Sequence, residues 1–363
     1  MRAVRIHSHG GPEVLQLDEI PEPTPGPGDL LVRLRATSVN HRDVWIRRGH
    51  PHPKYHVDLP AVLGIDVCGD VVEVGSEVEG FRPGDRVTAN PYMQCGACRY
   101  CVRGQFQLCP DFDVYNGTYA ELFLVPARFA VSLDPSVPDE HVAAFPNAYI
   151  TAWQMLVGKA RVDPADTVFV WAGTSGLGGA AIEIAKLAGA RVITSAGTEE
   201  KREVLRQGVA DEVLDHHAAD LVEGVLELTE GEGPTIVFEH VGQATFPTSV
   251  FVVKPFGKVV ICGATSGYNL DFDVRYLWMR QKEILGSHFA NAYECMRANQ
   301  LMAESKIRPV LWQAMGFEGV PEAHQLLHEN KHLGKISIMV GATDRDEGKH
   351  EDGPGAIWAE VGT

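Results

Sequence analysis

The sequence predicts an α/β protein in which a β-rich domain is joined to a doubly wound parallel sheet. Many short apolar runs separated by turn residues fill roughly the first 145 positions, which is typical of a β-rich domain. From about residue 150, strand-like and helix-like segments alternate, which is typical of parallel strands connected by helices. A glycine-rich turn at 172–179 stands near the start of this alternating part.

The composition limits the class of protein. A chain of 363 residues that is 45% hydrophobic can form two domains with cores of their own. Its formal net charge of −16 argues against nucleic acid or an anionic membrane surface as a partner. Because no apolar run could span a bilayer and residues 1–7 do not resemble a signal peptide, we expect a cytoplasmic protein.

Short strands and turns account for the first part of the chain. Residues 1–20 alternate as a strand pair around a turn at 9–12, and a proline- and glycine-rich loop follows at 21–28. Further strands are predicted at 30–36, within 62–74 and at 85–89. The β-rich domain therefore extends to about residue 145.

Four of the seven cysteines lie in one short segment: Cys95, Cys98, Cys101 and Cys109. Such clustering favours metal binding in a reducing compartment over a disulfide framework. Four thiolates can close a tetrahedron around zinc with no open position, so we predict one structural Zn²⁺ per chain. An iron–sulfur cluster is the alternative, because cysteine spacing alone does not select the metal.

Strands and helices alternate in the second part of the chain. The predicted helices are 150–157, 180–187, 199–207 and 221–228. The predicted strands are 168–171, 190–195, 212–214, 235–238, 258–262 and 283–287. A helix at 292–305 leads back to the β-rich domain, where the final strand at 335–340 belongs. The polar tail from residue 343 is expected to be disordered or loosely attached.

The glycine-rich turn predicts a dinucleotide-binding site. A strand, a glycine turn and a helix in succession bring a pyrophosphate against the first free N–H groups of the helix. Glycine lets the backbone approach the phosphates without a Cβ in the way. The alternative is an ordinary tight turn, which the following strand at 190–195 makes less plausible, because it completes a βαβ unit. The predicted contacts are Gly173, Ser175, Gly176, Leu177 and Gly178.

The end of the second strand favours NADPH over NADH. An NAD-dependent enzyme usually places an acidic residue there for the ribose hydroxyls, whereas this chain has Ser195 followed by Ala-Gly-Thr. Lys201 or Arg202 can meet a 2′-phosphate, and we favour Lys201. Alternatively, both are solvated residues in the first turn of a helix, where Glu199 and Glu200 interact with the helix dipole.

These parts, in this order, resemble the medium-chain dehydrogenase/reductase superfamily of zinc alcohol dehydrogenases and quinone reductases. The four-cysteine segment and Ala172–Gly178 carry the resemblance, which covers nearly the whole chain. It implies a GroES-like catalytic domain at 1–147 and 292–342 with a zinc lobe at 92–110. It also implies a Rossmann NAD(P)-binding domain at 148–291, a tail at 343–363, and a homodimer or homotetramer.

Three positions depart from the zinc alcohol dehydrogenases. That family has cysteines where this chain has Asn40 and Asn147, and Gly-His-Glu where this chain has Gly-Ile65-Asp66. Without those ligands no Lewis acid polarises an alcohol oxygen, so we expect no catalytic zinc. The run Asn40-His-Arg-Asp43 instead resembles the zinc-free reductases, which reduce C=C bonds conjugated to a carbonyl.

A narrower resemblance joins residues 236–310 to crotonyl-CoA carboxylase/reductase and its enoyl-CoA reductase relatives. The matching runs are 236–240, 249–251, 265–268, 275–279 and 286–291. The resemblance implies that Asn40, His288 and the pair Phe112-Asp113 surround the reacting carbon, with aspartate in place of the family's glutamate. The further cofactor contacts expected are Thr151, Ser195, Lys201, His216, Val241, Gly263, Ala264, Ser287 and Phe289.

Each proposed catalytic residue also has a structural interpretation. His288 can donate a proton to an enolate, or it can simply be hydrogen-bonded at the end of the 283–287 strand. Asn40 can cap a turn, as asparagine often does. Asp113 can be a solvated loop residue, whereas pairing with His288 would raise the pKa of that histidine. Because Asp113 is one methylene shorter than glutamate, it disfavours a carbon dioxide pocket.

The sequence therefore predicts NADPH-dependent reduction of a short 2-enoyl-CoA, of the acryloyl- or crotonyl-CoA type. Hydride would be added at Cβ, and the resulting enolate would take a proton or carbon dioxide at Cα. One alternative is a quinone or enone reductase, or an alcohol dehydrogenase-like oxidoreductase, acting on a carbonyl substrate without CoA. An alternative of another class is a non-catalytic NADPH-binding protein.

Overall fold

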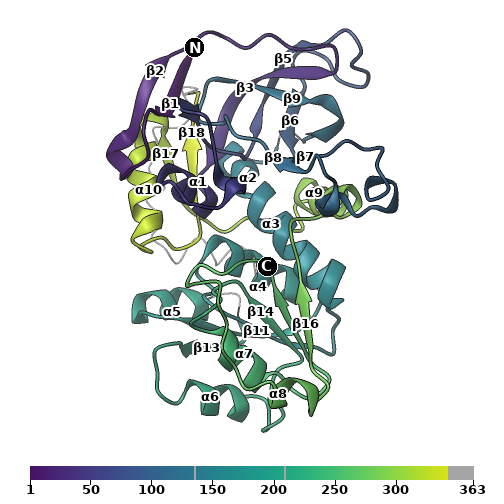
Figure 1. Cartoon of the computed structure of the whole chain (residues 1–363), viewed down its shortest axis with the longest axis vertical. Helices are drawn as coiled ribbons and strands as arrows, with labels where there is room; N and C mark the ends of the chain where they lie inside the picture. The colour runs from purple at the N-terminus through teal and green to yellow at the C-terminus, as the bar shows by residue number, and fades with distance from the viewer. Residues whose placement is uncertain (135, 208–209, 342–363) are drawn as a thin grey trace. The chain divides into compact units, whose positions relative to one another are not determined.

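The computed structural model describes residues 1–134, 136–207 and 210–341 (Figure 1). The chain divides into two compact units. One unit is formed by Met1–Asn147 together with the segment that begins at Asn291, and the other by Ala148–Ala290. The predicted tail at 343–363 lies outside the described residues.

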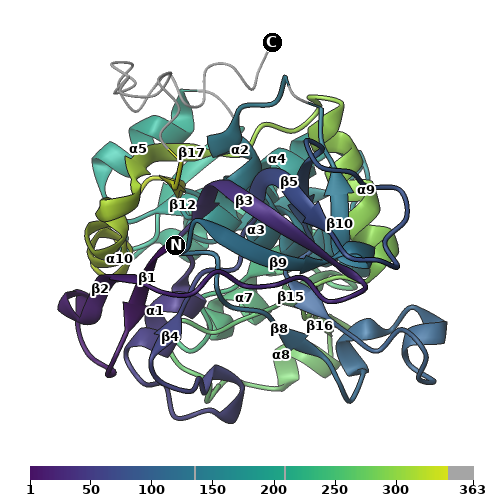
Figure 2. The ribbon, with the colours of Figure 1, turned by 90° about the horizontal axis from the view of Figure 1, so that it is seen from above.

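The first unit is built on a seven-stranded sheet in the order β10-β6-β5-β3-β18-β17, with β9 also paired to β3. Its strands are β3 (Asp29–Ser38), β5 (Cys68–Val74), β6 (Arg86–Ala89), β9 (Leu122–Pro126), β10 (Ala130–Ser132), β17 (Leu311–Gly316) and β18 (Lys335–Met339). Figure 2 shows the long strand β3 with β9 beside it. Strand β18, the last that the structure describes, therefore lies inside the sheet, between β3 and β17.

Two smaller sheets complete this unit. One has the order β2-β1-β4 and the other pairs β7 with β8. Their strands are β1 (Arg2–Ile6), β2 (Leu15–Glu19), β4 (Ala61–Val62), β7 (Tyr92–Met93) and β8 (Asp113–Val114). The predicted strand pair at 1–20 is confirmed, with Arg2 opposite Glu19 and Ile6 opposite Leu15.

Helices at four places cover the first unit. They are α1 (His41–Arg47), α2 (Asp139–Ala144), α9 (Ala292–Ala303) and α10 (Val320–His328). Of these four helices, only α9 was predicted from the sequence. Helix α1 is too short to show a helical period, and it forms because Val44 and Ile46 join the core while the Asp43 carboxylate accepts the N–H of Asn40 at 3.0 Å.

The second unit contains a parallel six-stranded sheet in the order β13-β12-β11-β14-β15-β16. Its strands are β11 (Thr167–Val170), β12 (Arg191–Ala196), β13 (Glu212–Asp215), β14 (Ile236–Glu239), β15 (Lys258–Ile261) and β16 (Glu283–Gly286). Its helices include α4 (Gly176–Leu187), α5 (Glu199–Arg206), α6 (Leu221–Glu227), α7 (Phe246–Val252) and α8 (Arg275–Trp278). This order and the parallel register confirm the doubly wound sheet.

The helix predicted at 150–157 is longer than the sequence indicated. Helix α3 (Pro146–Trp153) starts at a proline, which is favoured in a first helical turn, and continues as a π-helical segment, Gln154–Ala160. The segment ends at Arg161, which has the left-handed φ of 57°. No helix among the described residues is long and apolar enough to cross a membrane.

Candidate active site

The glycine-rich turn follows β11 and shapes a cradle at the start of α4. A Cβ on Gly173 would lie 2.3 Å from Thr194 Oγ1, and a Cβ on Gly178 would lie 2.3 Å from the carbonyl oxygen of Ala172. Ser175 begins the helix, because its Oγ accepts the N–H of Gly178 at 2.9 Å. The first N–H groups of a helix have no partner within it, so this turn offers donors to an anion. These features fit a dinucleotide pyrophosphate.

Basic and imidazole side chains gather where β12 ends. Ser195 Oγ lies 3.5 Å from Nδ1 of His216, and a Cβ on Gly197 would lie 2.7 Å from Nε2 of the same histidine. Thr198 begins α5 by accepting the N–H of Lys201 at 3.3 Å. Burial lowers the pKa of Lys201, and burial followed by the neighbouring His217 lowers that of His216. No acidic residue occupies positions 195–198, which fits a 2′-phosphate better than a free ribose hydroxyl.

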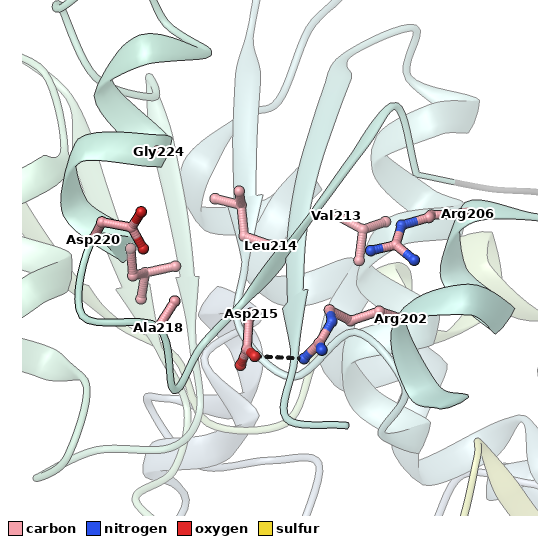
Figure 3. Close-up of a pocket in the computed structure, with 9 residues that line it drawn as sticks. Arg202, Arg206, Val213, Leu214, Asp215, Ala218, Asp220 and Gly224 are labelled. Atoms are coloured by element: carbon pink, nitrogen blue, oxygen red, sulfur yellow. Dashed lines mark ion pairs between the residues drawn. The ribbon is translucent and has the colours of Figure 1, made fainter. Parts of the chain in front are cut away.

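Arg202, the other predicted partner of a 2′-phosphate, is already engaged by carboxylates. Its Nη1 lies 2.8 Å from Asp215 Oδ2 and its Nη2 lies 2.7 Å from Glu199 Oε2. Figure 3 shows the pair of Arg202 and Asp215 on the wall of a pocket lined by residues of α5, β13 and α6. The geometry therefore favours Lys201 over Arg202 for contact with a phosphate.

The loops after β14 and β16 carry the remaining predicted cofactor residues. Buried Glu239 organises the first loop, since its Oε1 accepts the N–H of Val241 at 2.7 Å and that of Gly242 at 3.0 Å. After β16, the Oγ of buried Ser287 has no hydrogen-bond partner among the described residues, as expected of a group that meets a ligand. Thr151 lies on α3, and Gly263 and Ala264 follow β15.

His288 follows Ser287 and is exposed on the nucleotide-binding unit. Its ring centroid lies 4.8 Å from that of Phe289, which has a left-handed φ of 47°. Asn40, Phe112 and Asp113 belong to the other unit. The structure thus divides the predicted catalytic residues between the two units.

Asn40 is embedded in a buried polar cluster in the β-rich unit. Its Nδ2 donates to Asp66 Oδ2 at 2.8 Å, and its Oδ1 accepts from Asn147 Nδ2 at 2.9 Å. Asp66 is completely buried and also accepts from Ser38 Oγ at 2.5 Å and from the N–H of Asn147 at 3.0 Å. Asn40 is also the residue that caps the start of α1, where the Asp43 carboxylate accepts its N–H at 3.0 Å, so the structural and the catalytic interpretations of Asn40 are compatible.

Lys335 closes this cluster from β18. Its Nζ lies 2.7 Å from Asn40 Oδ1, 3.3 Å from the carbonyl oxygen of Val39 and 3.5 Å from Asp66 Oδ2. The side chain is 5% exposed, and burial lowers the pKa of the ammonium while Asp66 opposes that shift. Lys335 was not predicted from the sequence as a site residue. Its only signal in the sequence was a lysine at the start of a mostly apolar strand.

Phe112 and Asp113 differ in their surroundings although they are adjacent. Phe112 is buried, and its ring centroid lies 5.9 Å from that of Tyr92. The Nζ of Lys54 lies 5.4 Å from the centroid of the Phe112 ring. Asp113 is exposed, and its Oδ1 accepts the N–H of Val114 at 2.8 Å. Asp113 thus lies in the short strand β8 and not in a loop, and its carboxylate is directed at the backbone of that strand.

The four cysteines form a compact cluster in the β-rich unit. Their Sγ atoms all lie within 4.8 Å of one another, with Cys98 and Cys101 3.6 Å apart. Thiolates bound tetrahedrally to zinc at about 2.3 Å would be about 3.8 Å apart, so the arrangement fits that ion. The N–H groups of Ala97 and Cys98 donate to Cys95 Sγ, which lowers the pKa of that thiol to about 7. No other cluster among the described residues offers three or more such ligands.

Comparison with known proteins agrees with this geometry. Residues 26–135 match the family model of the alcohol dehydrogenase GroES-like domain, and residues 176–304 match that of the zinc-binding dehydrogenases. The crotonyl-CoA reductase of Streptomyces collinus is 33% identical to this chain, over 92% of the chain and 83% of the relative. The chain belongs to the medium-chain dehydrogenase/reductase superfamily. It is an oxidoreductase related to both enoyl-CoA reductases and alcohol dehydrogenases.

Solved structures similar to this chain include both alcohol dehydrogenases and enoyl-CoA reductases. A structure of an NAD-dependent alcohol dehydrogenase is 40% identical, has a TM-score of 0.89 and covers 94% of this chain and all of its own. The crotonyl-CoA carboxylase/reductase AntE in complex with NADP is 29% identical, has a TM-score of 0.85 and covers 94% of this chain and 95% of its own. Both confirm the GroES-like domain and the Rossmann-like sheet implied by the resemblance.

The chain lacks the donors that superfamily alcohol dehydrogenases use for a catalytic zinc. Ile65 is completely buried and has no atom that can bind a metal. Asn40 and Asn147 are hydrogen-bonded to each other and to Asp66, and Lys335 places a positive charge among them. The residues present therefore do not fit a catalytic zinc, whereas the four cysteines fit a structural one.

Proposed function

We propose that this oxidoreductase uses NADPH to reduce the C=C bond of a short 2-enoyl-CoA thioester. The observation that carries the proposal is the Asn40 amide, which is held by Asp66 and Lys335 at the position where alcohol dehydrogenases have a zinc ligand. A hydrogen-bond donor can stabilise a thioester enolate without any metal. The likeness to crotonyl-CoA reductases supports this choice of substrate.

NADPH supplies the hydride when it is bound, and the chain's own residues orient the reactants. The cradle of Gly173, Ser175 and Gly178 would hold the pyrophosphate, while Lys201 and His216 would meet the 2′-phosphate. The Asn40 N–H would stabilise negative charge that develops on the thioester oxygen. His288 would donate the proton that the enolate takes at Cα.

We further propose that the enolate is protonated rather than carboxylated. The family resemblance places a phenylalanine–glutamate pair at the carbon dioxide site, and this chain has Phe112-Asp113. The Asp113 carboxylate is short, exposed and bonded to the N–H of Val114. It is therefore poorly suited to shape a pocket for carbon dioxide.

The edge of the parallel sheet at β16 supports a homodimer. Strand β16 is at the edge of the sheet, and among the described residues its one partner strand is β15. Trp278 and Met279, at the end of α8, are 63% and 61% exposed. Large exposed side chains beside an open strand edge are typical of an interface, and such an interface agrees with the dimers that the resemblance implies.

An alcohol dehydrogenase activity is the second candidate, because one 40% identical structure is of an NAD-dependent alcohol dehydrogenase. The metal position counts against it in this chain. The hydrophobic side chain of Ile65 and the ammonium of Lys335 are incompatible with a zinc-bound alkoxide there.

The deciding experiment is an assay of NADPH oxidation with crotonyl-CoA and acryloyl-CoA, each with and without bicarbonate. A simple quinone and an aldehyde serve as comparison substrates, and NADH as the comparison cofactor. We expect turnover of the thioesters and the same saturated product with or without bicarbonate. Turnover of only the quinone or aldehyde would overturn the choice of substrate, and a carboxylated product would overturn the role given to Asp113. Oxidation of NADPH with any of these substrates would exclude a non-catalytic protein.

A further inference from the structure

In the buried cluster, the amide of Asn40 lies between a positively and a negatively charged group, namely Lys335 and Asp66. The ammonium of Lys335 and the carboxylate of Asp66 contact opposite ends of the Asn40 amide, at 2.7 Å and 2.8 Å. The ammonium can only donate hydrogen bonds, and the ionised carboxylate can only accept them. If the amide rotated by 180°, its NH₂ would face the ammonium and its oxygen would face the carboxylate. Both contacts would then be repulsive.

This arrangement leaves one polar hydrogen of the amide for another partner. Asn40 Oδ1 accepts two hydrogen bonds, from Lys335 and from Asn147 Nδ2, which fills its two lone pairs. Asn40 Nδ2 donates one of its two hydrogens to Asp66. Asn40 keeps 6% of its surface exposed. What the side chain can still offer is therefore a donor.

We propose that Lys335 is a positioning residue that fixes the Asn40 amide so that it offers a hydrogen-bond donor, and not an acceptor, to the reacting thioester. The inference rests on the proposed function, in which Asn40 stabilises an enolate oxygen. The ammonium supplies, from protein alone, a positive charge beside the position where related enzymes have a zinc ligand. Asp66 balances that charge and fixes the other end of the amide.

The structure also explains why a lysine can stay charged there. Its Nζ has three acceptors within 3.5 Å, namely Asn40 Oδ1, the Val39 carbonyl oxygen and Asp66 Oδ2, so its three hydrogens can each find a partner. Buried charges persist when they are paired and hydrogen-bonded in this way. Removal of Lys335 alone would leave Asp66 buried without a counter-charge, and the protein could then fail to fold for that reason.

The test is a double-mutant cycle on the full chain that removes both charges together. The variant Asp66→Asn/Lys335→Met keeps the cluster neutral and similar in volume, and it no longer dictates which way the amide lies. The same pair is also made in an Asn40→Ala background. Lys335→Arg retains the charge, and Lys258→Met, which removes a lysine bonded to the Ala160 carbonyl oxygen in the other unit, is the matched control.

With crotonyl-CoA, we expect the paired variant to lower kcat by up to about a hundredfold, because complete removal of an oxyanion donor costs about 10²–10³ in kcat and this variant only frees the donor to turn away. Affinity for NADPH should not change. In the Asn40→Ala background, the paired change should have little further effect on kcat. Lys335→Arg, which keeps the charge, should have a kcat between those of the paired variant and wild type. Lys258→Met should have the kcat of wild type. An equal loss in both backgrounds, or no loss at all, would overturn the role of Lys335.

A second readout separates this inference from the choice of substrate. The two side-chain amide protons of Asn40 are in different surroundings, because one is bonded to Asp66, so their NMR signals should be well separated. The Asn40→Ala variant identifies these signals. In the paired variant we expect the difference between their two chemical shifts to become smaller, whichever substrate the enzyme uses. If they stay unchanged, Lys335 does not orient the amide. If wild type reduces no thioester but the signals respond, only the proposed function fails.

Discussion

Arg202 Nη1 lies 2.8 Å from Asp215 Oδ2, and this ion pair fastens α5 to the end of β13. The guanidinium is only 13% exposed and also contacts Glu199. Arg202 is thus a structural residue, although its position beside Lys201 made both of them candidates for a cofactor phosphate. In the proposed function, Lys201 and the neighbouring His216 are then the residues that would meet the 2′-phosphate of NADPH.

Lys201→Ala should therefore weaken NADPH binding selectively. Loss of a hydrogen bond to a charged phosphate costs about 1.5–3 kcal/mol, which raises Kd about tenfold or more. NADH lacks the 2′-phosphate, so its Kd should hardly change. Fluorescence titration of both cofactors checks this, with Lys186→Ala as a control, since Lys186 pairs with Asp211 on the surface. Equal weakening of both cofactors would contradict the assignment.

His288→Asn should impair catalysis without affecting cofactor binding. Removal of a general acid typically lowers the rate about 10²- to 10⁴-fold. We expect kcat with crotonyl-CoA to fall within that range while Kd for NADPH stays within twofold (about 0.4 kcal/mol). His328→Asn, which changes an exposed histidine at the end of α10, is the control. Unchanged kinetics and products would return His288 to a structural role.

Purified protein should contain one zinc per chain, held by Cys95, Cys98, Cys101 and Cys109. Cys109→Ser should lose the metal and lower the melting temperature, because the lobe has little core of its own. A loss of about 2 kcal/mol would lower Tm by roughly 4–8 °C. Metal analysis and calorimetry measure both, and Cys262→Ser, which alters a cysteine outside the cluster, should keep the zinc. Two tightly bound zincs per chain would disprove the ligand argument.

Stability at mildly acidic pH should depend on His324 and Asp43, which contact the same hydroxyl of Tyr119. Burial lowers the pKa of His324 to about 3, so the unfolded chain binds a proton first and His324 makes folding less favourable as pH falls below about 6.5. Burial raises the pKa of Asp43 to about 6, so Asp43 favours folding as pH falls from about 6 to about 4.

As pH falls, His324 and Asp43 change the free energy of unfolding in opposite directions. A variant that removes one of the two groups should therefore reveal the effect of the other. Between pH 6 and pH 4, His324→Gln should become more stable relative to wild type by about 1.4 kcal/mol per pH unit. Asp43→Asn should become less stable by a similar amount. Urea unfolding at pH 4, 5, 6 and 7 measures these differences. Parallel pH profiles for all three proteins would show that neither group keeps its shifted pKa.

Trp278→Glu should weaken self-association. The substitution places a charge among exposed apolar side chains beside the edge strand β16, where the proposed dimer forms. Light scattering after gel filtration should give a dimer or larger assembly for wild type and a smaller mass for the variant. Leu17→Glu, which changes an exposed apolar residue of β2, should leave the mass unchanged. A monomeric wild type would remove the basis for the prediction.

Local patterns predicted the parallel sheet and the cysteine cluster well, because each depends on residues that are close in sequence. The turn between β11 and α4 is such a case, since the glycines that shape it lie within seven residues. Helix α1 was missed because its burial comes from distant strands. The partners of Asn40 were missed for the same reason: Asp66 is 26 residues away and Lys335 is 295 residues away. Periodicity and spacing do not report such contacts.

The position of β18 bears on how the protein is made. Strand β18 lies between β3 and β17, and it carries the lysine that closes the cluster around Asn40. Domains generally fold as units while the chain is synthesised, so the nucleotide-binding unit, complete by Ala290, is finished on the ribosome first. The sheet of the β-rich unit cannot be completed until β18, which begins at residue 335, has been synthesised. Lys335, which we propose orients the Asn40 amide, is thus synthesised after the cofactor cradle and after most of the β-rich unit, and a chain that stops short of it would lack this ammonium.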